Sequence, residues 1–314
     1  MLDTVLKGDA VMDLDFDMEI FKTEMKAKKE YVDKNLKKLL TAEDTHPPVI
    51  HQAMHYAVFN GGKRLRPIMV LESARLAGGT PESVMPTACA IELIHSYSLV
   101  HDDLPAMDND DYRRGKLTCH KVFGEANGIL TGDALLTAGF EFMAKNSEVD
   151  GIKPLNVIKV IKEVAFAVGS QGMIGGQVMD LEAENRVIDY DTLQTLHSLK
   201  TGRLFRAALT AGAILNDMNN DGLDSLRQYA HNFGLAFQIT DDILDIKGDA
   251  ALLGKPIGSD EKNHKTTYPS LFGLERSQEL AVQSVNACIK SLSGFGAEAD
   301  FLRRLALFVL YRQN

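Results

Sequence analysis

The sequence predicts an all-α protein that folds as a single helical domain. Apolar residues recur at the helical spacing of three and four in many segments, and we find no segment with the two-residue alternation of a half-buried strand. Stretches rich in proline or glycine separate these segments, at 46–48, 78–80 and 254–260. Because no fixed repeat or low-complexity linker interrupts the chain, we expect the helices to share one core.

The predicted helices follow one another between these breaks. The N-terminal segment is acidic and lacks both an Arg-rich amphipathic pattern and the apolar region of a signal peptide. We interpret 1–16 as a flexible N-terminal extension before a domain over 17–314. The first helix is predicted over 17–42, and "HPP" at 46–48 opens the second. The full set is predicted over 17–42, 47–60, 64–78, 83–103, 128–145, 154–169, 172–185, 189–201, 203–217, 221–247, 268–273, 277–293 and 297–312.

Composition narrows the possible functions. The 314 residues are 45% hydrophobic, which is enough for a large core, and the net charge of −9 argues against a nucleic-acid partner. No apolar run approaches the roughly 20 residues of a membrane span. Three cysteines without CxxC spacing suggest a reducing cytosol, so we expect a cytoplasmic protein. The glycine-containing stretches 172–176 and 248–256 match neither a dinucleotide site nor a phosphate loop.

One acidic motif lies on the apolar stripe of the helix predicted over 221–247. The stripe consists of Leu223, Leu226, Ala230, Phe233, Phe237, Asp241 and Leu244. Asp241 therefore occupies a position where a buried residue is expected, and Asp245 lies one turn further on the same side. Two carboxylates so placed repel each other, and burying them unpaired is costly. A bound cation resolves the conflict, although a helix end that turns to solvent is an alternative.

A second acidic motif, "HDDLPAMDNDDYRRG", follows the helix predicted over 83–103. His95 and Asp102 share a face of that helix with apolar residues. Pro105 disfavours helix at Leu104, so the chain must bulge after the helix to bring Asp108 back beside Asp102. Oxygen ligands favour hard cations, and Mg²⁺ commonly combines one or two carboxylates with substrate phosphates. Two such motifs on two helices indicate several Mg²⁺ ions held on one polyanionic ligand.

Basic residues near both motifs support a phosphate-containing ligand. "GGKRLRP" places Lys63, Arg64 and Arg66 at the start of a predicted helix, where the helix dipole also favours anions. Arg113 and Arg114 follow the first acidic motif directly. Further basic residues are Lys200 in "HSLKTG", Lys255 in "GKPIGSD" and Lys265 in "KTTYP". Each alone is an ordinary surface charge, and only the whole set points to a site.

These motifs, in this order and spacing, resemble those of the trans-polyprenyl diphosphate synthase family. The resemblance is carried by "GGKRLRP", "ELIHSYSLVHDDLPAMDNDDYRRG", "GMIGGQVMD", "HSLKTG", "GLAFQITDDILD" and "GKPIGSDEKNHKTTYP". It extends from about residue 20 to the C-terminus and is strongest to the bacterial-type farnesyl diphosphate synthases. It implies an all-α isoprenoid-synthase-type bundle around a deep central cavity, and a homodimer. It also implies a cytoplasmic prenyltransferase that joins isopentenyl diphosphate to dimethylallyl diphosphate and geranyl diphosphate.

The resemblance assigns a role to each motif residue. It implies three Mg²⁺ ions per active site when substrate is bound, held by Asp102, Asp103, Asp108, Asp241, Asp242 and Asp245. Isopentenyl diphosphate would be held by Lys63, Arg66, His95 and Arg114. The allylic diphosphate would be held by Arg113, Lys200, Lys255 and Lys265, with Thr201 and Gln238 beside the carbon that becomes cationic. Lys200, Thr201, Gln238 and Lys255 would therefore be the catalytic set.

The length of the product is the point that the resemblance fixes least. The family usually controls it with the residues four and five positions before the first aspartate, which are Ser98 and Tyr97 here. A tyrosine there implies the fifteen-carbon farnesyl product. Geranylgeranyl or geranyl diphosphate synthase is the alternative within the family. A terpene cyclase would not need the site of Lys63, Arg66 and His95, and a non-catalytic synthase subunit would commonly lack the aspartate motifs that are intact here.

Overall fold

The computed structural model describes residues 16–247 and 265–312, and its regular elements are almost all helices. The long helices are α2 (Met18–Leu39), α3 (Pro48–Val58), α4 (Leu65–Leu76), α5 (Pro81–Asp102), α7 (Glu125–Lys145), α8 (Pro154–Val168), α9 (Met173–Ala183), α11 (Arg203–Leu215), α12 (Asn220–Lys247), α16 (Leu274–Ser291) and α17 (Asp300–Tyr311). The shorter ones are α6 (Cys119–Phe123), α10 (Tyr190–His197) and α15 (Tyr268–Phe272), with single turns η1 (Asn146–Glu148), η2 (Ser198–Gly202) and η3 (Ala297–Ala299). The predicted all-α class is confirmed.

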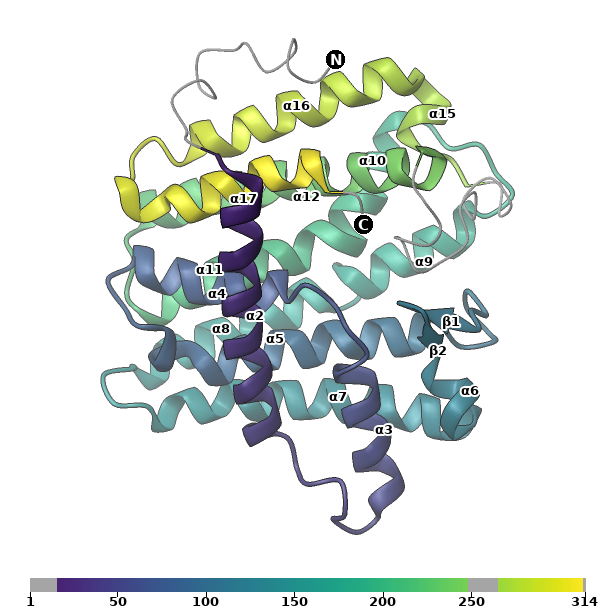
Figure 1. Cartoon of the computed structure of the whole chain (residues 1–314), viewed down its shortest axis with the longest axis vertical. Helices are drawn as coiled ribbons and strands as arrows, with labels where there is room; N and C mark the ends of the chain where they lie inside the picture. Colours follow the sequence, from purple (N-terminus) through teal and green to yellow (C-terminus); the bar gives the residue numbers. More distant parts are fainter. Residues whose placement is uncertain (1–15, 248–264, 313–314) are drawn as a thin grey trace.

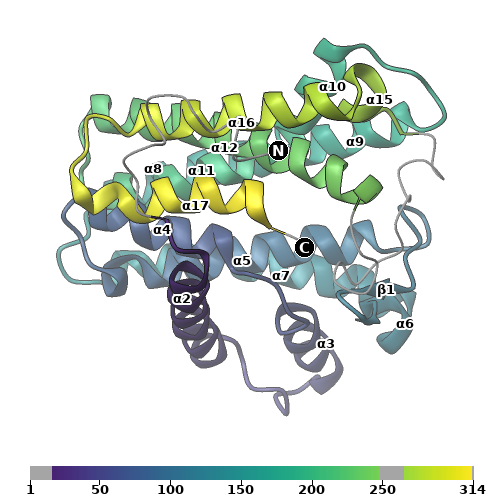
Figure 2. The same ribbon diagram turned by 45° about the horizontal axis from the view of Figure 1, so that its top comes forward.

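Most of the long helices lie alongside one another in stacked layers (Figure 1). Helix α12 lies between α16 and α11, α11 packs against α4 and α8, and α5 packs against α4 and α7. Figure 2 shows α2 and α3 on the outside of these layers, running across them. Of the segment predicted to be flexible, 1–16, only Phe16 belongs to the described part, and its ring centre lies 5.8 Å from those of Phe21 and Tyr311.

The apolar stripes meet in an extended core at the centre of the stack. On α12, Leu226, Ala230 and Phe233 are fully buried, as their spacing predicts. The ring of Phe205 on α11 lies 5.1 Å from that of Phe233 and 5.3 Å from that of Phe237, centre to centre. Aromatic rings at such distances add to the free energy that area burial supplies. This cluster fixes α11 against α12, and both helices carry predicted site residues.

Local sequence sets several helix ends that differ from the predicted ones. Helix α5 starts at Pro81 instead of residue 83, because the Thr80 side chain caps it by accepting a hydrogen bond from the Ser83 amide and proline is tolerated in a first turn. Helix α7 starts at residue 125 and α16 at residue 274, each three residues before its predicted start. The segment predicted as one helix over 297–312 divides into η3 and α17.

Two small elements between α5 and α7 were not predicted at all. The strands β1 (Tyr112–Arg113) and β2 (Lys116–Leu117) pair antiparallel, with Tyr112 opposite Leu117. The five-residue helix α6 follows. Strands of two residues are too short to show an alternating pattern, so periodicity could not reveal them. The hairpin matters because it carries two arginines, Arg113 and Arg114, toward the end of α5.

The two helices predicted over 189–201 and 203–217 form one continuous helix. Helices α10 and α11 are joined by the π-helical turn η2, in which the backbone widens by one residue. The apolar pattern was therefore right on both sides of Gly202, but the break assigned to that glycine was wrong. Such widened turns are frequent at functional sites, and this one contains Lys200 and Thr201.

None of the three cysteines forms a disulfide, and all are buried. Burial raises the pKa of the Cys119 thiol to about 11, so this thiol stays protonated near neutral pH.

No described helix has the length and apolar character needed to cross a membrane.

A buried arginine, Arg64, ties four helices together just before α4. Its Nε donates to Asp33 Oδ1 of α2 at 2.7 Å, its Nη1 to Glu92 Oε1 of α5 at 2.6 Å, and its Nη2 to the Val58 carbonyl of α3 at 2.7 Å. Arg64 and Glu92 are 3% and 2% exposed. Because a buried charge that loses its partner is left uncompensated, we expect this contact to dominate the stability of the region.

Replacing Glu92 with alanine should therefore lower the free energy of unfolding by about 3–5 kcal/mol, because Arg64 keeps its buried charge without its main partner. Urea denaturation followed by circular dichroism measures this value. The control is Glu279→Ala, which removes an exposed partner of Arg276 at the same ion-pair length of 2.6 Å and should cost no more than about 1 kcal/mol. Equal losses in the two variants would contradict the role given to Arg64.

Candidate active site

A cavity of about 1250 Å³ opens between the helix layers and contains most of the predicted site residues. Its wall is formed by the start of α4, the C-terminal half of α5, the β1–β2 hairpin, Leu136 of α7, α9, α10 with η2, α12, residues 265–267, and Arg312 after α17. The wall contains both charged side chains and apolar ones, the latter including Leu99, Leu136 and Met173. A cavity of this size exceeds what one small ligand needs, so it can hold two substrates at once.

The first acidic motif lies at the end of α5, where the chain turns back as predicted. Helix α5 ends at Asp102, and the Asp108 amide donates to the Asp102 carbonyl at 2.9 Å, which brings the two residues together. Asp102 lines the cavity, but Asp103 is buried beside it and accepts a hydrogen bond from Arg113 Nε at 2.7 Å. Asp103 thus positions Arg113, and its role as a metal ligand stays a prediction.

The Asp102 carboxyl lies where its charge is poorly compensated. Burial and the nearby Asp108 and Asp103 carboxylates raise the pKa of Asp102 to about 6, even though Lys200 and Arg113 act in the opposite direction. A divalent cation bound there would remove this strain, so the site fits the Mg²⁺ that the sequence suggests.

The second acidic motif divides into three residues with different surroundings. Asp241 faces the cavity and accepts a hydrogen bond from Arg312 Nη2 at 3.2 Å. Asp242 is buried, with Oδ1 accepting from Gln238 Nε2 at 2.9 Å and Oδ2 from the Tyr268 amide at 3.0 Å. Asp245 is also buried and does not line the cavity. Asp241 is therefore the member of this motif best placed to bind a metal, whereas Asp242 orients Gln238 and the start of α15.

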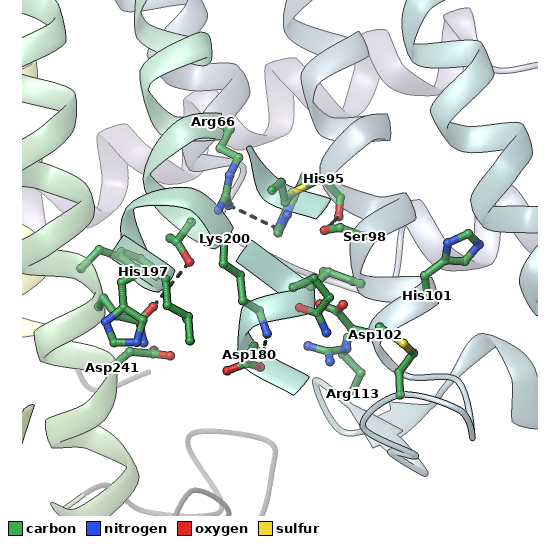
Figure 3. Close-up of a pocket in the computed structure, with 18 of the residues that line it drawn as sticks. Arg66, His95, Ser98, His101, Asp102, Arg113, Asp180, His197, Lys200 and Asp241 are labelled. Atoms are coloured by element: carbon green, nitrogen blue, oxygen red, sulfur yellow. Dashed lines mark hydrogen bonds and ion pairs between the residues drawn. The ribbon is translucent and has the colours of Figure 1, made fainter. Parts of the chain in front are cut away.

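Asp102 and Asp241 approach the cavity from different walls and lie on either side of Lys200 (Figure 3). Within residues 16–247 and 265–312, no group of three or more His, Cys, Asp or Glu side chains is close enough to hold a metal ion unaided. Mg²⁺ does not require such a group, because it usually combines one or two carboxylates with waters and substrate phosphates. This arrangement fits ions that bind together with a phosphate ligand.

Four basic side chains also line the cavity: Lys63, Arg66, His95 and Arg114. Three of them come from the segment at the start of α4 and from the hairpin, and His95 comes from α5. Arg66 Nη1 lies 3.4 Å from His95 Nε2, and the Arg66 guanidinium lies 4.2 Å above the Phe205 ring. Arg114 Nη1 donates to the Gly61 carbonyl at 2.8 Å. Gly62 has φ of +102°, a conformation that favours glycine, and a Cβ there would also displace the Arg114 guanidinium, whose Nη1 would lie 2.6 Å away.

The pKa values of these groups reflect an excess of positive charge. Burial, with repulsion from Arg312 and Arg114, lowers the pKa of Lys63 to about 8. Burial also lowers the pKa of Arg66 to about 10 and holds that of His95 well below its usual value. Arg66 Nε is buried and has no hydrogen-bond partner among the described residues. A bound anion would relieve both the repulsion and the missing hydrogen bond.

Lys200 and Lys265 converge on a carboxylate to which the sequence gave no role. Their ammonium groups donate to Asp180 Oδ2 at 2.7 and 2.9 Å, and Figure 3 shows Lys200 reaching across the cavity to Asp180. Burial opposes ionisation of Asp180, but the two lysines hold its pKa below the usual value. Asp180 is part of "GMIGGQVMD", so the motif was noticed without its function in positioning two lysines being identified.

The π-helical turn η2 sets the position of Lys200 and Thr201. A Cβ on Gly176 of α9 would lie 2.3 Å from the Lys200 amide nitrogen, so only glycine allows α9 and η2 to pack this closely. Thr201 Oγ1 donates to Gln238 Oε1 at 3.4 Å, and Gln238 is in turn held by Asp242. The pair predicted to lie beside the reacting carbon is therefore together at the cavity wall.

Tyr97 and Ser98 both line the cavity from α5. Tyr97 is only 5% exposed and its ring contacts that of His101 edge-on, with centres 5.7 Å apart. The Ser98 hydroxyl donates to the His95 carbonyl at 2.9 Å. Lys255 lies outside the described residues.

Two further residues of the site were missed from sequence. Arg312 stacks on Phe237 with its guanidinium 3.9 Å from the ring centre, and its Nη2 also donates to the Phe237 carbonyl at 2.9 Å. It stands almost at the end of the chain, outside every motif, so only the fold reveals it. His197 lines the cavity with its ring stacked on Tyr268, and burial lowers its pKa to about 4.

Comparisons with known proteins give a consistent family. The profile of the polyprenyl synthetase family matches residues 47–301. The chain is 44% identical to a geranylgeranyl diphosphate synthase of Cyanophora paradoxa (91% of this chain, 95% of that protein) and 40% identical to a farnesyl diphosphate synthase of Bacillus subtilis (85% and 90%). It is also similar to the crystal structure of an FPP/GFPP synthase from Zymomonas mobilis, with a TM-score of 0.82 and 40% identity over 92% of this chain and 98% of that one.

Replacing Asp102 with asparagine should stabilise the protein in the absence of divalent cations. In the folded protein the pKa of this carboxyl is about 6, which is above its ordinary value of 3.8. Its ionised form therefore destabilises the fold above pH 6, and this penalty disappears as the pH falls through 6 toward 3.8. At neutral pH we expect the free energy of unfolding of Asp102→Asn to exceed that of the wild type by about 1–2 kcal/mol. This difference should shrink toward acid pH.

Urea denaturation at a series of pH values, with a chelator present, measures this difference. Asp150→Asn, at an exposed position, serves as the control and should change the free energy of unfolding by no more than about 0.5 kcal/mol. A gain of stability in Asp102→Asn that stayed the same down to acid pH would show that its cause is not the buried charge.

Proposed function

The chain belongs to the polyprenyl synthetase family, and we propose that it makes farnesyl diphosphate by adding isopentenyl diphosphate to dimethylallyl diphosphate and then to geranyl diphosphate. Its relatives place it among the trans-prenyl diphosphate synthases, which are prenyltransferases. They include synthases of both farnesyl and geranylgeranyl diphosphate, so the product length rests on the cavity of this chain. The observation that carries the proposal is one cavity lined by two groups of cations, two acidic motifs and the buried Tyr97.

The two groups of cations suggest two diphosphate sites. Lys63, Arg66, His95 and Arg114 would hold isopentenyl diphosphate, and Arg113, Lys200 and Lys265 the allylic diphosphate, together with Lys255 from outside the described residues. Each cation of the allylic group in the described part is oriented by a carboxylate, Asp103 or Asp180. This orientation lowers the entropy lost when the diphosphate binds, because the donors already point into the cavity.

Asp102 and Asp241 would hold Mg²⁺ against the allylic diphosphate. Bound there, Mg²⁺ supplies positive charge that makes the diphosphate a better leaving group. Lys200 and Arg113 add hydrogen bonds to the oxygens on which charge develops when the carbon–oxygen bond breaks. We propose three ions per site, as the family suggests, with Asp108 beside Asp102 as a further ligand and Asp245 assisting Asp241 directly or through water. Asp103 and Asp242 would act on the metal sites mainly through Arg113 and Gln238, which they hold.

The allylic cation left behind must meet the second substrate before it meets water. Thr201 and Gln238 present oxygen dipoles to it, and their hydrogen bonds keep these oxygens in place. Apolar wall residues such as Leu99 and Met173 exclude water from the growing chain. The double bond of isopentenyl diphosphate then attacks the cation, a new carbon–carbon bond forms, and a proton leaves. The departing diphosphate is the base that we assign to this proton.

Tyr97 supports the fifteen-carbon product over the alternatives. Its side chain stands in the cavity wall about one and a half turns before Asp102. Burial and the Asp102 charge raise its pKa to about 12, so the phenol stays neutral. A product tail that grows along α5 away from Asp102 meets this ring. Geranylgeranyl diphosphate synthase is the second candidate, because such enzymes are among the relatives at more than 40% identity.

We also propose that two copies form a homodimer in the cytoplasm. Exposed apolar side chains on β2, α6 and α7 support this assembly, since they form neighbouring parts of the surface that a monomer would leave in water: Leu117, Val122, Ile129 and Leu130.

The direct test is product analysis with isopentenyl diphosphate and each of dimethylallyl, geranyl and farnesyl diphosphate. We expect fifteen-carbon product from the first two, little from the third, and no product when Mg²⁺ is removed by a chelator. Asp102→Ala and Asp241→Ala should each lower turnover by a factor of at least about 100, since each removes a carboxylate proposed to bind the Mg²⁺ that holds the leaving diphosphate. Asp221→Ala, exposed in the first turn of the same helix as Asp241, is the control. Near-normal turnover in both site variants would refute the metal assignment.

Replacing Tyr97 with alanine should lengthen the product to twenty carbons or more, because the cavity gains room for roughly one isoprene unit. The first condensation should change little, as Tyr97 lies away from the diphosphate groups. Chromatography of the dephosphorylated products gives the chain lengths. Phe142→Ala, a buried aromatic truncation on α7 outside the cavity wall, should lose comparable stability, about 3–5 kcal/mol, without altering the products. If Tyr97→Ala still stops at fifteen carbons, Tyr97 is ordinary packing.

A further inference from the structure

A second, smaller cavity of about 80 Å³ lies on the other side of the π-helical turn, between η2 and α12. It is lined by Gln194, His197, Ser198, Gly202, Arg203, Arg206, Arg227, His231, Gly234 and Leu235. Lys200 and Thr201 of η2 line the main cavity, Ser198 and Gly202 line the smaller one, and His197 lines both. None of its arginines belongs to the machinery described for catalysis.

Three guanidinium groups surround this cavity. Arg203 and Arg206 come from the first turn of α11, and Arg227 from α12. Burial and the charges of Arg227 and Arg203 lower the pKa of Arg206, while Glu163 acts in the opposite direction. Arg227 Nη1 donates to Asp224 at 2.7 Å, and Glu163 is also bonded by the Thr210 hydroxyl at 3.0 Å. Two carboxylates, Asp224 and Glu163, thus lie near three arginines, so the positive charges outnumber the negative ones.

Three buried nitrogens of residues that line this cavity have no hydrogen-bond partner among the described residues. The Nε atoms of Arg203 and Arg227 are buried and have no hydrogen-bond partner among the described residues, and the same holds for His197 Nδ1. Buried polar atoms are almost always paired in folded proteins, so these nitrogens need partners that the described residues do not supply, which bound water or an anion can provide. The cavity has room for several waters or for one tetrahedral oxyanion, which offers acceptors in several directions.

We propose that this cavity binds a small oxyanion of the phosphate class, held by Arg203, Arg206 and Arg227. Arginine suits this ligand because its planar fork matches phosphate oxygens. The site goes beyond the proposed function and does not depend on it. Its ligand would rest against the backbone of η2, the turn that carries Lys200 and Thr201 on its other side.

Titration calorimetry with inorganic phosphate, without prenyl substrates, tests the proposal on the whole chain. The wild type is compared with Arg206→Gln/Arg227→Gln, which keeps the main cavity intact, so the difference reports the second site. The double variant should lose phosphate affinity by about tenfold or more, because it removes two charged donors. Arg75→Gln/Arg276→Gln removes two charges from exposed positions and should bind like the wild type. A parallel titration with pyrophosphate shows whether one or two phosphate groups are preferred.

Crystals of the wild type soaked in selenate give a test that needs no variant. Anomalous scattering should place selenium between Arg203, Arg206 and Arg227. Selenate found only in the main cavity, or equal phosphate affinity in the wild type and the Arg206→Gln/Arg227→Gln variant, would overturn the proposal. Prenyl transfer itself is not used as a readout, so a wrong assignment of the reaction leaves this result unaffected.

Discussion

The buried guanidinium of Arg64 determines how the main cavity is built. This residue has φ of +56° and stands between Lys63 and Arg66, which face the cavity. Its own guanidinium is held by Asp33, Glu92 and the Val58 carbonyl, so that it joins α2, α3 and α5 at the start of α4. The neighbouring cations can therefore stand close together in a poorly solvated wall, because the backbone that carries them is fixed by contacts that do not involve the ligand.

A similar division of roles recurs throughout the site, because some residues hold their neighbours in position while those neighbours face the ligand. Asp103 holds Arg113, Asp180 holds two lysines, and Asp242 holds Gln238. In each case an aspartate fixes the position of a neighbouring side chain that faces the cavity. The cost is visible at Asp102 and Lys63, whose pKa values are displaced toward the neutral form. Residual strain of this kind is typical of sites that are completed by a charged ligand.

Periodicity was sufficient for the helices and for the residues that lie on their faces. The stripe on α12 is buried from Leu223 to Phe233 as predicted, whereas Phe237, Asp241 and Leu244 are partly exposed. Helix α5 ends before Pro105, and the chain then brings Asp108 back to Asp102 as predicted. Periodicity could not predict contacts between distant segments of the chain. Neither the two lysines on Asp180 nor Arg312 on Asp241 has a local signal, since the partners are 20 to 85 residues apart. The π-helical turn was missed for a different reason, because one extra residue in a turn leaves the apolar pattern intact on both sides.

The widened turn η2 also constrains how this segment of the chain can change in length. An α-helix turns by about 100° per residue, so one residue gained or lost between α10 and α11 would rotate everything after it by that amount. Leu204, Phe205 and Ala208, which are buried in the core, would then turn toward a different neighbour. Insertions and deletions should therefore be excluded from 198–202, although single substitutions at the exposed edges of α10 are free to accumulate. The length of this turn is a fixed quantity of the fold.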